Sequence, residues 1–148
     1  MTTKIITQCS TDNLNCVLEI DKTSTSYHWT EQMFLQEFSK KNSFFNILIA
    51  DNIIVGYIIY NIVLDEAEIL NIVIDSNFKR KKHATFLLEQ TINDMIKKNI
   101  KTIFLEVGQN NIAAINLYLK FGFEQYGIRK EYYKNKENAI LMKRQLKA

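Results

Sequence analysis

Proline is absent from this 148-residue chain, and glycine occurs only four times. The chain has two cysteines, Cys9 and Cys16, whose spacing fits no metal site. A small secreted domain held by disulfides would carry more of them. We therefore expect both thiols to be reduced and buried, and we expect no metal centre.

No apolar run is long enough to cross a membrane as a helix. The most apolar stretch, residues 53–64, is interrupted by Gly56 and Asn61, whereas a spanning helix needs about 20 apolar residues. The chain begins MTTKIITQ, without an apolar signal region. These features predict a cytoplasmic protein with no membrane role.

Neither sign of charge is in large excess, because the net charge is only +3. That value is too small to argue for nucleic acid as a partner. The hydrophobic content of 47% fits an ordinary globular protein. Without a linker, repeat or low-complexity segment, we expect one domain over residues 1–148.

The apolar pattern predicts seven strands and four helices. The strands are expected at residues 4–9, 44–50, 53–64, 67–74, 102–107, 123–132 and 139–146. The helices are expected from Ser10 or Thr11 to about Asp21, from a Thr30 cap to about Lys41, over 84–96, and from an Asn111 cap to Gly122. The order β-α-α-β-β-β-α-β-α-β-β predicts an α+β fold, with a largely antiparallel sheet and helices on both faces.

Two turns and two helix faces are also predicted. Asp51-Asn52 is a two-residue hairpin signal, and Asp65-Glu66 is expected to form the next turn. The inner face of the second helix is expected to hold Met33, Phe34 and Phe38, and that of the last helix Ile112, Ile115, Tyr118 and Leu119.

Residues 69–123 combine a strand, a basic loop, a helix, a second strand, a polar loop and a second helix. The first loop, DSNFKRKK, puts cations beside a helix N-terminus, whose backbone N–H groups and dipole bind anions. Taken alone, the loop is about as consistent with a solvated basic turn or an RNA-binding patch as it is with a phosphate site. Its place between a strand and an amphipathic helix favours phosphate.

The segments VLDEAEILNIVI, FLEV, NNIAAINLYLKFGF and RKEYY together resemble the GCN5-related N-acetyltransferase (GNAT) superfamily. Within it, the chain is most similar to the bacterial ribosomal-protein-alanine N-acetyltransferases (RimI type). The resemblance implies the GNAT fold, a seven-stranded, mostly antiparallel sheet with about four helices on both faces. It also implies acetyl-CoA as cosubstrate and a ribosomal protein N-terminal peptide as partner.

The resemblance assigns cofactor-binding and catalytic roles. The backbone of Ile72, Val73 and Ile74 would bind the pantetheine arm and polarise the thioester carbonyl. Glu106 would be the general base and Tyr118 the general acid, although a carboxylate in an apolar strand usually faces solvent and a helical tyrosine is usually core. The other implied cofactor contacts are Arg80, Lys81, Lys82, His83, Ala84, Thr85 and Asn111, the last also a helix cap.

The phosphate loop departs from the family pattern Gln/Arg-x-x-Gly-x-Gly/Ala. Lys82 stands where the family has glycine, which permits positive φ and close approach to a phosphate. If that position needs positive φ, a lysine costs about 1 kcal/mol of strain. Its cation could equally pair with a phosphate, so both weaker and tighter cofactor binding stay open.

Aromatic residues are expected to flank the acceptor entrance. Tyr27, Trp29, Tyr132 and Tyr133 lie in loops there, and Asp65, Glu66 or Glu68 would suit a cationic N-terminus. Neither His28 nor His83 has a partner pattern that favours catalysis or metal binding.

The leading hypothesis is direct acetyl transfer from acetyl-CoA to an N-terminal alanine, by a monomer or weak homodimer that requires no nucleic acid. A lysine side chain or a small-molecule amine is the alternative acceptor. A non-catalytic acyl-CoA-binding module and an RNA-binding module are alternatives of other classes. The RNA hypothesis is disfavoured because the chain has no aromatic-rich RNP-type strand motif.

Overall fold

The computed structural model describes residues 2–133 and 136–146. Seven strands form one sheet in the order β1-β2-β3-β4-β5-β7-β6. The strands are β1 (Lys4–Gln8), β2 (Ser43–Ala50), β3 (Ile53–Val63), β4 (Glu66–Ile74), β5 (Thr102–Gly108), β6 (Glu124–Arg129) and β7 (Ala139–Gln145). The helices are α1 (Leu14–Ser24), α2 (Glu31–Ser39), α3 (His83–Lys97) and α4 (Ile112–Lys120), with 3-10 turns at Thr11–Asn13 and Ser76–Phe78.

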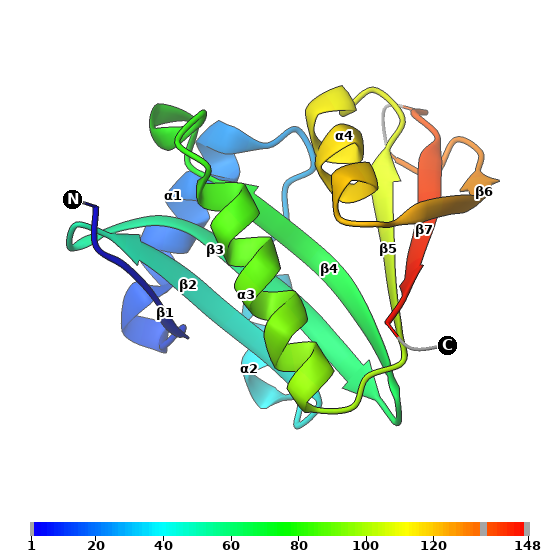
Figure 1. The fold of residues 1–148 in the computed structure, drawn as a ribbon. Coiled ribbons are helices and arrows are strands. Elements are labelled where there is room, and N and C mark those ends of the chain that lie inside the picture. Colours follow the sequence, from blue (N-terminus) through cyan, green and yellow to red (C-terminus); the bar gives the residue numbers. More distant parts are fainter. Residues whose placement is uncertain (1, 134–135, 147–148) are drawn as a thin grey trace.

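Two helices cover each face of the sheet (Figure 1). Alternate side chains of β3 point to opposite faces, so that Tyr57 packs with α1 and α2, and Ile58 packs with α3 and α4. The buried side chains thus form two apolar clusters, one on each face of the sheet. Each cluster stabilises the packing of its two helices mainly through burial of apolar surface. The predicted element order and the α+β fold are confirmed.

Both predicted turns exist, but one is displaced. Asp51 and Asn52 have φ values of 49° and 70°, as a two-residue hairpin turn between β2 and β3 requires. The next turn lies at Leu64 and Asp65, one residue earlier than expected, because Glu66 already belongs to β4. Leu64 takes the left-handed conformation there, with φ 56°.

Several element boundaries differ from the sequence prediction, most of them by a single residue, and the larger differences include the following three. The first helix starts with a 3-10 turn after Ser10 and runs to Ser24, three residues beyond the expected end. The second helix ends at Ser39. Strand β6 ends at Arg129 because Glu131 turns the chain with φ 50°, so the expected strand over 123–132 is too long. Residues 134–135 of the next loop lie outside the described residues.

The predicted inner faces of α2 and α4 are only partly correct. Phe34 is fully buried, but Met33 is exposed. In α4 Tyr118 is buried, whereas Ile112 and Leu119 are exposed. The face of α4 that meets the cavity and the core carries Ala114, Leu117 and Tyr118, so Ile112 and Leu119 lie outside that face.

This opening lies between β4 and β5. The two strands pair in parallel from Glu66–Ile69 with Thr102–Leu105, and no further pairs follow between them in the described chain. A bulge at Leu70 shifts the register of β4 against β3 at the same point. Figure 1 shows β4 and β5 diverging toward α4 and the start of α3.

Candidate active site

A cavity of about 810 Å³ fills the opening between β4 and β5. Its wall is built by both strands, the start of α3, α4 and the loops that follow α1, precede α3 and follow β6. Lys81 does not line it, and its ammonium lies 5.8 Å from the ring centre of Phe78. The predicted residues that line the cavity are Tyr27, Trp29, Ile72, Val73, Ile74, Arg80, Lys82, His83, Ala84, Thr85, Glu106, Asn111, Tyr118, Tyr132 and Tyr133.

The end of β4 offers backbone groups to the cavity. Ile72, Val73 and Ile74 pair with β3 on one edge, and their other edge faces the opening where β5 has diverged. Since backbone groups of a strand point alternately to its two edges, this edge can take an extended ligand as an added strand.

The basic loop forms a helix N-terminus at the cavity. Lys82 caps α3 with φ 62° and ψ 23°, and Arg80 has φ 65°. The family's glycine position therefore does take positive φ in this chain, which is the case in which a lysine is strained. The first N–H groups of a 15-residue helix have no acceptor within the helix, and they face this end of the cavity together with the Arg80 and Lys82 cations.

His83 is the first residue of α3 and is only 3% exposed. Its Nδ1 has no hydrogen-bond partner in the described residues. Burial, followed by the nearby Lys4 and Lys81, lowers the pKa of the imidazole. A neutral ring at this position adds no further charge to an already cationic loop.

Glu106 and Tyr118 approach the cavity from opposite faces of the sheet. Leu105 and Val107 belong to the core under α3 and α4, so Glu106, which lies between them, points to the other face. Tyr118 comes from α4. Both side chains line one cavity because the sheet is open between β4 and β5.

The surroundings of Tyr118 suit a proton donor. Its ring packs against Phe123 at 5.6 Å between centroids, so it is also a core residue. Burial raises its pKa far above the usual value, and the neighbouring Tyr133 adds to this. Burial and the nearby Glu106 also raise the pKa of Tyr133 to about 12. Both phenols therefore keep their protons at neutral pH.

Arg129 also lines the cavity, and we did not predict it as a site residue from the sequence. Its Nη2 lies 3.1 Å from Oε1 of Glu106, and its guanidinium carbon lies 5.0 Å from the centre of the Tyr132 ring. Glu68 lines the same region, and burial followed by Glu106 raises its pKa, while Arg129 opposes the shift. Only the insertion of β7 between β5 and β6, which the sequence does not reveal, brings these charges together.

Glu137 joins three loops at the entrance. The Tyr27 hydroxyl donates to one of its carboxylate oxygens, and the Asn110 N–H donates to the other at 2.6 Å. The Tyr27 and Tyr133 rings lie 4.2 Å apart. A Cβ at Gly108 would collide with the Tyr27 hydroxyl and lie 2.7 Å from Glu137 Oε2, so any larger residue would displace these side chains.

Neither cysteine lines the cavity. Cys9 is buried as expected, but Cys16 is exposed, which corrects that expectation. Burial, followed by Cys16, raises the pKa of Cys9 to about 11, and burial and Asp75 raise that of Cys16. Both are therefore poor nucleophiles at neutral pH.

Among the residues that the structure describes, no group of three or more histidine, cysteine or acidic side chains is arranged to hold a metal ion. Within residues 2–133 and 136–146, no helix has the length and apolar character needed to span a membrane.

The chain belongs to the acetyltransferase (GNAT) family, whose family model matches residues 14–123. It is 34% identical over 137 residues to the ribosomal protein bS18-alanine N-acetyltransferase of Salmonella typhimurium, covering 90% of this chain and 91% of that protein. The crystal structure of the ribosomal-protein-S18-alanine N-acetyltransferase from Escherichia coli superposes with a TM-score of 0.92 at 29% identity, over 99% and 96% of the two chains. Ard1 from Thermoplasma volcanium superposes with a TM-score of 0.90 at 25% identity, over 98% and 99%.

Proposed function

We propose that this protein is an acetyl-CoA-dependent N-alpha-acetyltransferase that acts on the N-terminal alanine of ribosomal protein bS18. The observation that carries the proposal is the meeting of Glu106 and Tyr118, from opposite faces of the sheet, in one cavity. The relatives named for this reaction match nine-tenths of the chain. A ribosomal substrate would place the enzyme in the cytoplasm. We also propose that residues 1–148 act as a single domain.

The residues present fit acetyl-CoA. The outer edge of β4 at Ile72–74 would take the pantetheine arm, and the start of α3 with Arg80 and Lys82 would take the diphosphate. Asn111 caps α4 by accepting from the Ala114 N–H at 3.2 Å, and it lines the same cavity. Acetyl-CoA would supply an activated acetyl group, with the coenzyme A thiolate as the leaving group.

Glu106 acts as the general base in this proposal. An N-terminal ammonium has a pKa of about 7.7–8.0, so a carboxylate, directly or through water, is a sufficient acceptor for its proton. In the structure the Glu106 carboxylate forms an ion pair with Arg129. The incoming ammonium would take over that ion pair, and the tyrosines of the entrance would exclude water around it.

Tyr118 acts as the general acid. Its raised pKa keeps the phenol protonated until a thiolate appears beside it. The amine nitrogen bonds to the acetyl carbon as the carbon–sulfur bond breaks. Glu106 takes the first nitrogen proton before attack and releases it to solvent. Tyr118 gives its proton to the sulfur, and the second nitrogen proton, lost after the new bond forms, passes through solvent and restores the phenol.

Turnover on three acceptors tests the proposal. An alanine-terminated bS18 peptide should be acetylated faster than an N-blocked lysine peptide or a small polyamine. Glu106→Gln and Tyr118→Phe should each lower kcat by about 10²–10⁴, with acetyl-CoA binding retained. Preference for lysine or the polyamine would assign another acceptor. Binding without any turnover would identify a non-catalytic acyl-CoA module.

A further inference from the structure

A chain of hydrogen-bonded side chains connects α1 with the wall of the cavity. Asp21 of α1 is 2% exposed, and its Oδ1 accepts from the Tyr57 hydroxyl at 3.0 Å. Asn71 of β4 donates from Nδ2 to the Tyr57 oxygen at 3.1 Å, and Asn71 lines the cavity. The mechanism above assigns no role to these three side chains, although burying a carboxylate and a phenol is costly.

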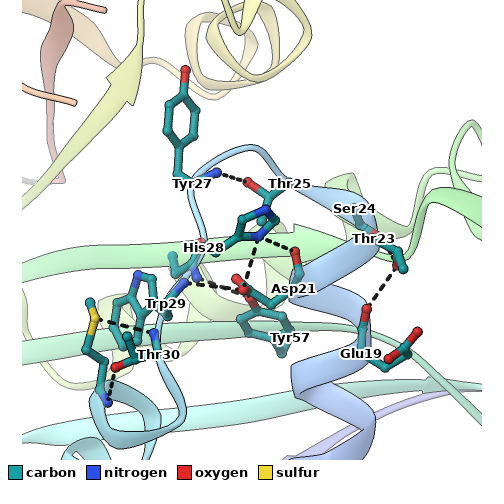
Figure 2. Close-up of polar contacts among 12 residues, drawn as sticks. Glu19, Asp21, Thr23, Ser24, Thr25, Tyr27, His28, Trp29, Thr30 and Tyr57 are labelled. Atoms are coloured by element: carbon teal, nitrogen blue, oxygen red, sulfur yellow. Dashed lines mark hydrogen bonds and ion pairs between the residues drawn. The ribbon is translucent and has the colours of Figure 1, made fainter. Parts of the chain in front are cut away.

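The surroundings of Asp21 suit its ionised form. Its Oδ2 accepts from the Trp29 N–H at 3.2 Å, and the His28 ring lies 3.5 Å away. Figure 2 shows Asp21 between Tyr57 on one side and His28 and Trp29 on the other. Burial raises the pKa of Asp21, while the bonds from Tyr57 and Trp29 oppose that shift.

The buried carboxylate fixes the direction of every bond in the chain. An ionised carboxylate can only accept, so the Tyr57 proton points to Asp21. The Tyr57 oxygen must then accept from the amide nitrogen of Asn71. That orientation turns the Asn71 carbonyl oxygen, Oδ1, away from Tyr57 and leaves it for a ligand in the cavity.

The bulge at Leu70 determines which face this oxygen serves. Ile69 packs under α3 and α4, and a regular strand would point Asn71 to the same side. Because Leu70 is the extra residue, Asn71 instead pairs with Ile59 and faces α1 and α2. This is also the face from which Glu106 reaches the cavity.

We propose that Asn71 positions the acceptor amine by accepting one of its N–H hydrogens at Oδ1. Tyr57 and Asp21 are positioning residues that hold the amide in this orientation. Glu106 removes one proton from the amine, and a second fixed acceptor would orient the remaining N–H groups so that the lone pair faces the thioester. The inference rests on the proposed function, since it assigns a contact to the acceptor of that reaction.

The test measures the acceptor and the cofactor separately. In Asn71→Ala and Tyr57→Phe, kcat/KM for the alanine-terminated peptide should fall about tenfold, as expected for loss of a hydrogen bond, with the acetyl-CoA Kd unchanged. The double variant should be no worse than Asn71→Ala, because Tyr57 acts through Asn71. Tyr60→Phe is the matched control, since Tyr60 is also a fully buried tyrosine of β3 but packs on the opposite face.

Three outcomes would overturn the inference. One is an unchanged kcat/KM in Asn71→Ala. The second is additive losses in the double variant, which would make Tyr57 a merely structural residue. The third is weaker acetyl-CoA binding with an unchanged acceptor KM, which would assign Asn71 to the cofactor. Failure of the wild type to acetylate any amine would instead refute the proposed function.

Discussion

Lys82 shows how a single residue can depart from a family pattern without changing the local backbone. The family's glycine position takes φ 62° here, although the residue is a lysine. Left-handed backbone costs a residue with a Cβ about 1–2 kcal/mol. The surrounding loop and helix therefore impose the left-handed conformation on Lys82. This residue lines the cavity.

Two substitutions at this position separate strain from charge. Lys82→Ala and Lys82→Gly both remove the cation, and only glycine removes the Cβ. We expect the glycine variant to be more stable than the alanine variant by about 1 kcal/mol. Both should bind acetyl-CoA about two- to fivefold more weakly than the wild type, as loss of one exposed charge predicts. Thermal unfolding and calorimetric titration would measure the two effects.

Equal stability of the two variants would mean that the loop relaxes out of the left-handed conformation in solution. Tighter acetyl-CoA binding by the glycine variant than by the wild type would show that close backbone approach matters more than the cation.

At the scale of elements, the cavity entrance depends on contacts between loops that are far apart in sequence. Tyr27 follows α1, Asn110 follows β5, and Glu137 precedes β7, yet the Glu137 carboxylate accepts from both of the others. The loops after β5 and before β7 are also joined by a backbone bond, from the Gln109 N–H to the Asn138 carbonyl at 2.9 Å. The Tyr27 loop is joined to these two loops through the Glu137 carboxylate and the Tyr27–Tyr133 ring contact.

Tyr27→Phe should loosen the entrance without harming the cofactor site. Loss of a hydrogen bond to a carboxylate should lower the free energy of unfolding by about 1–2 kcal/mol. The acceptor KM should rise severalfold, while the acetyl-CoA Kd stays unchanged because the α3 loop is untouched. Steady-state kinetics with a matched Tyr126→Phe control, at an exposed tyrosine on β6, would measure this. An acceptor KM equal to that of the wild type would contradict the assignment.

The sequence predicted what depends on local pattern and failed where the cause is non-local. Alternation and helical periodicity gave every element, and the Asn111 cap and the Asp51-Asn52 turn were correct because their chemistry lies within four residues. The exposure of Ile112 was not predicted, since a short, largely apolar helix leaves open which of its faces turns inward, and here that face carries Ala114, Leu117 and Tyr118. The Arg129–Glu106 pair and the Glu137 contacts follow from strand order and loop packing. The same limit applies to Asn71, whose direction is set by a bulge.

At the scale of the whole molecule, the sheet is open where β4 and β5 separate, and the proposed ligand site lies in this opening. The edges of β4 beyond Ile69 and of β5 beyond Leu105 diverge over the cavity. Filling this opening would add bonding to the two halves of the sheet, so binding should stabilise the fold as a whole. Acetyl-CoA at 100 times its Kd should raise the free energy of unfolding by about 2.7 kcal/mol.

Hydrogen exchange would locate that stabilisation. Acetyl-CoA should slow exchange at amides of residues 72–74 and 82–85, because the β4 edge and the α3 N-terminus would gain bonding partners there. S-acetylpantetheine lacks the diphosphate, so it should protect 72–74 and leave 82–85 unchanged. Strand β1, at the far edge of the sheet, is the internal control. Protection of α1 and α2 instead of these two segments would place the ligand on the other face of the sheet and refute the site.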